Sequence, residues 1–197
     1  MSDSWIIEQT DFESAKTVRH MESLFTLGNG YLGIRGDSIL SDWAFERGTY
    51  INGFYESGPI KYGEKAFGYA ENWQTIIPLP EGKEISISIN GREILTDKGV
   101  FRKQKRIQNL KESYNLWTFI WVDEDGLEYE GSVKSLVPFE LQGAAIFIWN
   151  LTLPEEESTI SFKSSLIYEN NTESEIKIHK IPIVKYIAAT NQAPLFI

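Results

Sequence analysis

The chain is organised around residues 22–37, which read Glu-Ser-Leu-Phe-Thr-Leu-Gly-Asn-Gly-Tyr-Leu-Gly-Ile-Arg-Gly-Asp. Four glycines, at positions 28, 30, 33 and 36, alternate there with large apolar or aromatic residues. Glycine suits positions where the backbone takes a positive φ or lies against another surface, and so many glycines argue against a helix. The pair Asn29-Gly30 is a strong signal for a tight turn between two strands. The segment therefore predicts a short hairpin over which the rest of a sheet packs.

Residues 28–33 also fit the G-x-G-x-x-G pattern of dinucleotide-binding proteins. That pattern works when its last glycine opens a helix whose N-terminus faces the pyrophosphate. Residues 34–37, Ile-Arg-Gly-Asp, are a poor first helical turn, and no strand-helix-strand unit is visible around them. We therefore interpret the match as a coincidence.

Alternating patterns elsewhere in the chain predict an all-β fold. Ile85, Ile87 and Ile89 alternate with polar residues, as in a strand with one buried face, and Asn90-Gly91 follows as a two-residue turn. Leu116–Val122 is apolar at nearly every position, which predicts a strand buried on both faces. Predicted strands recur about every 10 to 14 residues, and this spacing is typical of a sandwich or barrel.

Three segments carry weaker signals. Asp11–Met21 is polar and indicates a connection that leads into the glycine-rich segment. Glu56–Tyr69 contains glycine and proline, and Lys61–Lys65 within it predicts an exposed loop, with Phe67, Tyr69 and Trp73 on or beside it. Phe101–Glu112 is basic and mixed, which predicts a solvated edge strand. The alternative for this last segment is a basic patch for phosphate, to which the overall acidity gives little support.

Composition bounds the class of protein. Of the 197 residues, 42% are hydrophobic and 13% aromatic, which suffices for the core of one large domain. The net charge of −9 argues against nucleic acid or anionic membrane as a partner, and without cysteine there is no disulfide or thiolate metal site. No signal-peptide pattern is present, and no run reaches the roughly 20 apolar residues of a membrane helix. We therefore expect a cytoplasmic protein.

The glycine-rich segment as a whole is more specific than any of its parts. Residues 22–37 resemble the N-terminal signature of glycoside hydrolase family 65, the family of maltose, trehalose and kojibiose phosphorylases. The likeness continues through Arg47–Tyr55, which read Arg-Gly-Thr-Tyr-Ile-Asn-Gly-Phe-Tyr. It is weaker in residues 77–80 and 87–91, and beyond about Gly91 only the all-β pattern agrees.

The resemblance implies a fold and an activity. Members of family 65 carry an N-terminal antiparallel super-sandwich of the galactose mutarotase-like kind, then a linker, an (α/α)6 barrel and a small C-terminal sheet. They cleave an α-glucosidic disaccharide with inversion, by phosphorolysis or hydrolysis, with a glutamate of the barrel as general acid. In a phosphorylase, inorganic phosphate is the nucleophile and co-substrate.

No stretch of this chain resembles the helical barrel, so none of the family's catalytic residues has a matching position here. We therefore expect residues 1–197 to form a single N-terminal β-sandwich domain, in full or truncated form. By itself it would be catalytically silent and would need no cofactor or metal. The resemblance implies that it supports the catalytic barrel and the substrate cleft and contributes to homodimer contacts.

The candidate contacts with carbohydrate or with the cleft lie in the first half of the chain. They are Arg35, Asp37, Trp43, Tyr50, Phe54 and Trp73. Sugars stack on aromatic rings, although such rings also dominate ordinary cores. Arg35 is a candidate partner for a carboxylate or phosphate, with an internal ion pair as the alternative, while Asp37, like Glu22, could simply accept hydrogen bonds from turn amides. The two histidines, His20 and His179, have no ligand-like neighbours.

Two other functions remain open from the residues alone. A free-standing carbohydrate-binding sandwich would bind sugar through its aromatic side chains. A structural module would mediate self-association and bind no sugar.

Overall fold

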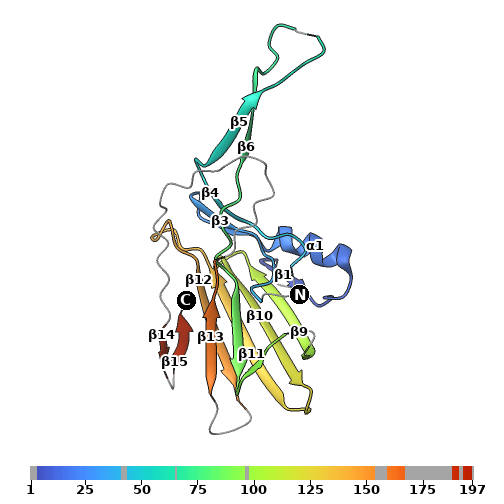
Figure 1. The fold of residues 1–197 in the computed structure, drawn as a ribbon, viewed down its shortest axis with the longest axis vertical. Coiled ribbons are helices and arrows are strands. Elements are labelled where there is room, and N and C mark those ends of the chain that lie inside the picture. Colours follow the sequence, from blue (N-terminus) through green and yellow to red (C-terminus); the bar gives the residue numbers. More distant parts are fainter. Residues whose placement is uncertain are drawn as a thin grey trace.

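The computed structural model describes residues 4–40, 44–64, 66–95, 98–153, 159–166, 188–190 and 193–196. Its largest element is an antiparallel seven-stranded sheet of order β1-β9-β10-β11-β12-β15-β14 (Figure 1). In that order the strands are Ile6–Gln9, Gly99–Asn109, Tyr114–Asp123, Glu128–Leu136, Ile146–Thr152, Ala193–Phe196 and Ala188–Thr190. The long neighbouring strands β10 and β11 pair without a register shift. The first pair is Tyr114 with Leu136, and the last is Val122 with Glu128.

A smaller sheet of order β13-β7-β8 provides the second layer. Its strands are Ile160–Ser164, Ile85–Ile89 and Arg92–Glu93. The three isoleucines of β7 are buried and share one core with the aromatic residues of β10, namely Trp117, Phe119 and Trp121. The predicted alternation in β7 is therefore confirmed, and the fold is an antiparallel β-sandwich.

The glycine-rich segment forms the predicted hairpin. Strands β2 (Leu27–Gly28) and β3 (Leu32–Ile34) pair with each other, and β4 (Thr49–Ile51) adds a third strand to this small sheet. The backbone N–H of Asn29 donates to Leu32 O at 3.1 Å, so Gly30, with φ of 85°, and Tyr31 form the tip. Gly33 lies inside β3 instead of opening a helix, which agrees with rejection of the dinucleotide pattern.

An arm projects from one end of the sandwich (Figure 1). It is a hairpin of β5 (Tyr55–Pro59) and β6 (Asn72–Ile76), and every residue of β6 is exposed. The predicted exposed loop at Lys61–Lys65 lies between these two strands, and its described residues, 61–64, are exposed and outside both strands, as expected. Trp73 lies directly across from Gly58, and the indole covers the space where a Cβ on that glycine would lie.

The polar connection predicted at Asp11–Met21 is wrong, because helix α1 spans Ala15–Leu24. Ser14 caps this helix by accepting from the backbone N–H of Thr17 at 3.5 Å, and Asp11 Oδ1 accepts from backbone N–H groups two and three residues later. Serine and aspartate are favoured at this position because they satisfy helix-end donors. The helix is short and its sequence is mostly polar, so the pattern of apolar residues did not indicate a helix.

Two strand predictions also need correction. In Leu116–Val122 the alternate residues Leu116, Thr118 and Ile120 are only half-buried, so this strand has one fully buried face rather than two. The segment Phe101–Glu112 is not simply an edge strand, because β1 pairs with the second half of β9. The prediction failed because composition does not reveal which neighbour a strand acquires.

Candidate functional site

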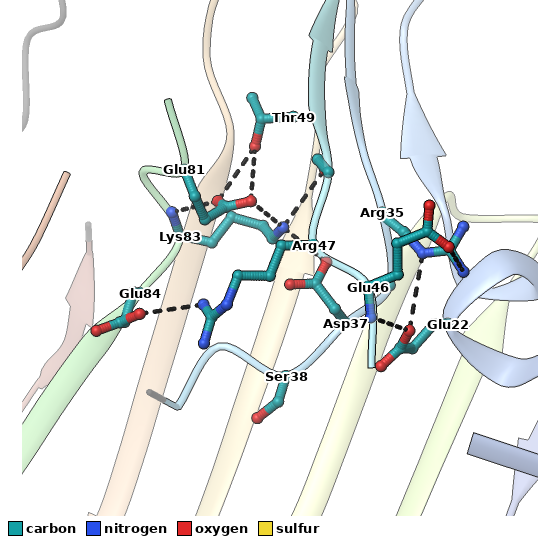
Figure 2. Close-up of polar contacts among 12 residues, drawn as sticks. Glu22, Arg35, Asp37, Ser38, Glu46, Arg47, Thr49, Glu81, Lys83 and Glu84 are labelled. Carbon is teal, nitrogen blue, oxygen red and sulfur yellow. Dashed lines mark hydrogen bonds and ion pairs between the residues drawn. The ribbon is translucent and has the colours of Figure 1, made fainter. Parts of the chain in front are cut away.

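A buried group of charged side chains lies where the glycine-rich segment meets residues 81–84, which lead into β7 (Figure 2). Lys83 Nζ is 2.7 Å from Asp37 Oδ1 and 2.7 Å from Glu81 Oε2. It also approaches Gly48 O at 3.4 Å. Thr49 Oγ1 donates to the Glu81 carboxylate at 3.1 Å. One lysine thus bridges two carboxylates that come from separate parts of the chain.

Burial controls the electrostatics of this group. Desolvation raises the pKa of Asp37 to about 6, although the Lys83 ammonium acts in the opposite direction. A carboxyl group taken out of water disfavours its charged form, and here one cation shared between two acids does not offset that effect completely. Asp37 therefore titrates nearer to neutral pH than an ordinary aspartate does.

A second cluster fixes the end of helix α1. The Glu22 carboxylate is buried and accepts from the backbone N–H groups of Phe45 at 2.7 Å and Glu46 at 3.1 Å. Arg35 lies 3.7 Å from Glu22 Oε2 and 3.5 Å from Glu46 Oε2. Glu22 thus has the amide-binding role expected for it, whereas Asp37 pairs with a lysine. The ion pairs of Arg35 are internal.

Arg106 joins the group from β9. Its guanidinium donates to Gly36 O at 2.7 Å and lies over the Phe25 ring, 4.7 Å from the centroid. Burial of this head group lowers the pKa of Arg106 to about 10, opposed by the charges of Asp37 and Glu22. The residue as a whole is half-buried, and its guanidinium lies against Gly36 O and the Phe25 ring.

A cavity of about 40 Å³ lies at these charges. Asp37, Lys83, Arg106, Asn115 and Trp117 are among the residues that line it. Pockets that hold small-molecule ligands usually measure about 300 to 1,000 Å³. The cavity is therefore too small for a sugar ring.

The structure separates the sequence-predicted residues into two groups. Arg35 and Asp37 lie in neighbouring parts of the buried network. Tyr50 is half-buried on β4, opposite Gly33. Phe54 is half-buried just before the arm, and Trp73 is 43% exposed on the arm itself.

The predicted candidate Trp43 lies outside the described residues, as does His179, which was not expected to bind a ligand. His20 is exposed on helix α1. Within the described part of the chain, no three His, Cys, Asp or Glu side chains are grouped so that they could hold a metal ion. No helix in that part is both long and apolar enough to cross a membrane.

Sequence reasoning missed Glu81, Lys83 and Arg106. The first two belong to the run Glu-Gly-Lys-Glu, which has the composition of a solvated turn. Arg106 lies opposite the buried Trp117 in the register of β9 and β10, so its inward position depends on a pairing that the sequence does not show. A charged residue in an otherwise polar strand gives no other signal.

Comparison with known proteins agrees with this architecture. The family model described as glycosyl hydrolase family 65, N-terminal domain, matches residues 7–188. The chain belongs to this family. The likeness seen in residues 22–37 is therefore confirmed, and as a family 65 N-terminal domain the chain has the β-sandwich expected of it.

Several of the proteins similar to this chain are phosphorylases. The chain is 30% identical over 169 residues to an α,α-trehalose phosphorylase of Thermoanaerobacter brockii, covering 83% of this chain and 22% of that protein. It is 30% identical over 115 residues to a kojibiose phosphorylase of the same organism, covering 56% of this chain and 14% of the relative.

A solved structure resembles the fold. A candidate kojibiose phosphorylase from the human microbiome superposes with a TM-score of 0.64 at 23% identity, over 82% of this chain and 21% of that one. This family 65 domain thus spans about a fifth of the length of these relatives.

Proposed function

We propose that this chain is the non-catalytic N-terminal domain of a larger family 65 enzyme. That enzyme would cleave an α-glucosidic disaccharide with inversion, by phosphorolysis with inorganic phosphate as co-substrate or by hydrolysis. The domain would support the catalytic barrel and the substrate cleft. The observation that carries the proposal is the family match over residues 7–188, combined with coverage of only about a fifth of the relatives' length.

The buried charges support a structural role for this domain. Glu22 binds two backbone N–H groups, and Asp37 and Glu81 share Lys83. Carboxylates held in this way by internal partners are not turned toward a substrate. The cavity beside them, at about 40 Å³, also excludes a sugar.

The arm is the surface through which we expect the domain to reach the catalytic part. It carries exposed aromatic side chains, among them Tyr55, Tyr69 and Trp73 at 42%, 54% and 43% exposure. An isolated two-stranded hairpin is at best marginally stable in water, and clustered exposed apolar groups mark interaction sites. A neighbouring domain would both cover these rings and hold the hairpin.

The test compares the isolated 197-residue chain with the polypeptide encoded by its whole reading frame. Each is supplied with phosphate and with trehalose, kojibiose or maltose, and the release of glucose 1-phosphate and of glucose is measured. The proposal predicts turnover by the longer polypeptide and none by the isolated chain. Turnover by the isolated chain would contradict the non-catalytic role.

The exposed rings also favour a second candidate, a carbohydrate-binding sandwich. Sugar titration by calorimetry would then give a binding signal that Trp73→Ala abolishes. Trp5→Ala is the matched control, because Trp5 is 52% exposed but lies outside the arm. Loss of binding in both variants would exclude a specific arm site.

Self-association is the third candidate, because the same exposed arm could pair with a second copy. Sedimentation at increasing concentration would show a dimer that Tyr69→Ala or Trp73→Ala weakens. A cytoplasmic location also belongs to this proposal, and the acidic composition and lack of cysteine support it.

A further inference from the structure

Three of the residues that line the cavity beside Asp37 carry a polar atom whose hydrogen-bonding capacity is not used. Asp37 Oδ2, Asn115 Oδ1 and Trp117 Nε1 are buried and have no hydrogen-bond partner among the described residues. All three residues line the cavity, and their exposed fractions are 4%, 8% and 7%. Buried polar groups in folded proteins nearly always have a partner, so three such atoms around one cavity indicate a ligand.

The volume restricts that ligand to something very small. A cavity needs about 10 to 15 Å³ of this kind of volume to hold one water molecule. At about 40 Å³, the space accepts a few waters or one small ion. A sugar or a nucleotide does not fit.

The chemistry of the lining distinguishes water from an ion. Asp37 Oδ2 and Asn115 Oδ1 are acceptors, whereas the Trp117 indole N–H is a donor. A cation would face the Lys83 ammonium and the Arg106 guanidinium, which also line the cavity. An anion would face the Asp37 carboxylate. Only a molecule that donates and accepts hydrogen bonds, and carries no charge, satisfies all three atoms.

We propose that this cavity is a hydration site, in which ordered water bridges Asp37 Oδ2, Asn115 Oδ1 and Trp117 Nε1. Asp37 follows strand β3 of the glycine-rich segment, whereas Asn115 and Trp117 belong to β10 of the large sheet. The water therefore adds a further link between the glycine-rich segment and the large sheet, beside the direct hydrogen bond from Arg106 to Gly36 O. Asn115 Nδ2 already donates to Phe25 O at 2.6 Å, so the bridge completes the second half of that amide's bonding.

Two buried tryptophans make an internal comparison. The indole nitrogens of Trp117 and Trp149 are both buried without a hydrogen-bond partner among the described residues, but Trp149 does not line this cavity. In water-selective NOE and ROE spectra of the unmodified protein, the Trp117 indole proton should show a cross-peak of the sign that marks slowly exchanging bound water. The Trp149 indole proton should show none. Equal behaviour of the two indoles would overturn the proposal.

A crystal structure of the unmodified protein provides the second readout. The proposal predicts density at hydrogen-bond distance, about 2.7 to 3.2 Å, from at least two of the three atoms. Crystals soaked in bromide or rubidium should show no anomalous signal there. A cavity without density would overturn the hydration site, and an anomalous peak in it would replace water by an ion.

Discussion

Lys83 Nζ lies 2.7 Å from Asp37 Oδ1 and at the same distance from Glu81 Oε2, in a site where all three side chains are buried. Breaking a buried ion pair by removing one partner typically destabilises a protein by about 3 to 5 kcal/mol. We expect Lys83→Met to lower the free energy of unfolding by about that amount, because it leaves two adjacent carboxylates without their cation. Urea unfolding at neutral pH measures the loss.

An exposed lysine is the control for that change. Lys105 pairs with Glu8 at 2.9 Å, but both side chains are about half exposed. Exposed ion pairs contribute about 0 to 1 kcal/mol, so Lys105→Met should change the free energy of unfolding by less than about 1 kcal/mol. Equal losses in the two variants would mean that the buried network does not hold the fold.

Stability should depend on the ionisation of Asp37. Its pKa in the folded state is about 6, above the ordinary value of 3.8, so between these values the folded chain binds more protons there than the unfolded chain. The contribution of Asp37 therefore makes stability fall as pH rises from about 4 to about 6. Roughly two pKa units correspond to about 3 kcal/mol.

The comparison with Asp37→Asn isolates this effect, because asparagine does not ionise. Unfolding free energies of both proteins are measured from pH 4 to 7, and the difference between them should change across that window. Asp11 and Asp123 have lowered pKa values, so they titrate below this pH window. Both are present in the two proteins and do not contribute to the difference. Parallel pH profiles of the two proteins would contradict a raised pKa of Asp37 in the folded state.

Replacement by alanine should affect stability differently at two glycines of the glycine-rich segment. A Cβ on Gly36 would lie 2.6 Å from Phe25 C and 2.7 Å from Phe25 O, whereas a Cβ on Gly33 would meet nothing within 4 Å. Backbone atoms do not move aside easily, so Gly36→Ala should destabilise by about 3 kcal/mol, the upper end for overpacking. Gly33→Ala should change stability by less than about 1 kcal/mol. Thermal unfolding of the pair checks both, and a tolerated Gly36→Ala would show that the contact with Phe25 is looser than described.

The arm should contribute little to the stability of the isolated domain. Trp73 is 43% exposed, so Trp73→Ala should lower its free energy of unfolding by less than about 1 kcal/mol. Trp121 is 1% exposed, so Trp121→Ala should lower the free energy of unfolding by about 3 to 5 kcal/mol. In the longer polypeptide Trp73→Ala should reduce turnover. Unfolding of the isolated domain by Trp73→Ala would instead assign the indole to internal stability.

The local features of the fold could be predicted from the sequence. The hairpin expected at Asn29-Gly30, whose tip lies one residue later at Gly30 and Tyr31, and the buried isoleucines of β7 follow from backbone sterics and from the two-residue period of a strand. Both signals depend on only a few neighbouring residues, so they can be recognised without knowledge of the rest of the fold. Helix α1 was missed because its evidence is a cap at Ser14 rather than a clear apolar face.

Most of the buried network could not be predicted, because its members come from distant segments. Asp37 and Lys83 are 46 residues apart, and Arg106 reaches Gly36 only through the register of β9. Charged residues are ordinarily exposed, so each of these would be placed on the surface by composition alone. Glu22 was the exception, because its role as an acceptor for backbone amides was expected, although the amides that it binds are those of Phe45 and Glu46.

The most direct test of the central claim is hydrogen–deuterium exchange of arm residues 55–76, in the isolated chain and in the polypeptide encoded by the whole reading frame. If this domain supports a catalytic part through the arm, amides there should exchange more slowly in the longer polypeptide, while those of β10 stay unchanged. Identical exchange of the arm in both proteins, or a reading frame that ends at Ile197, would contradict the account.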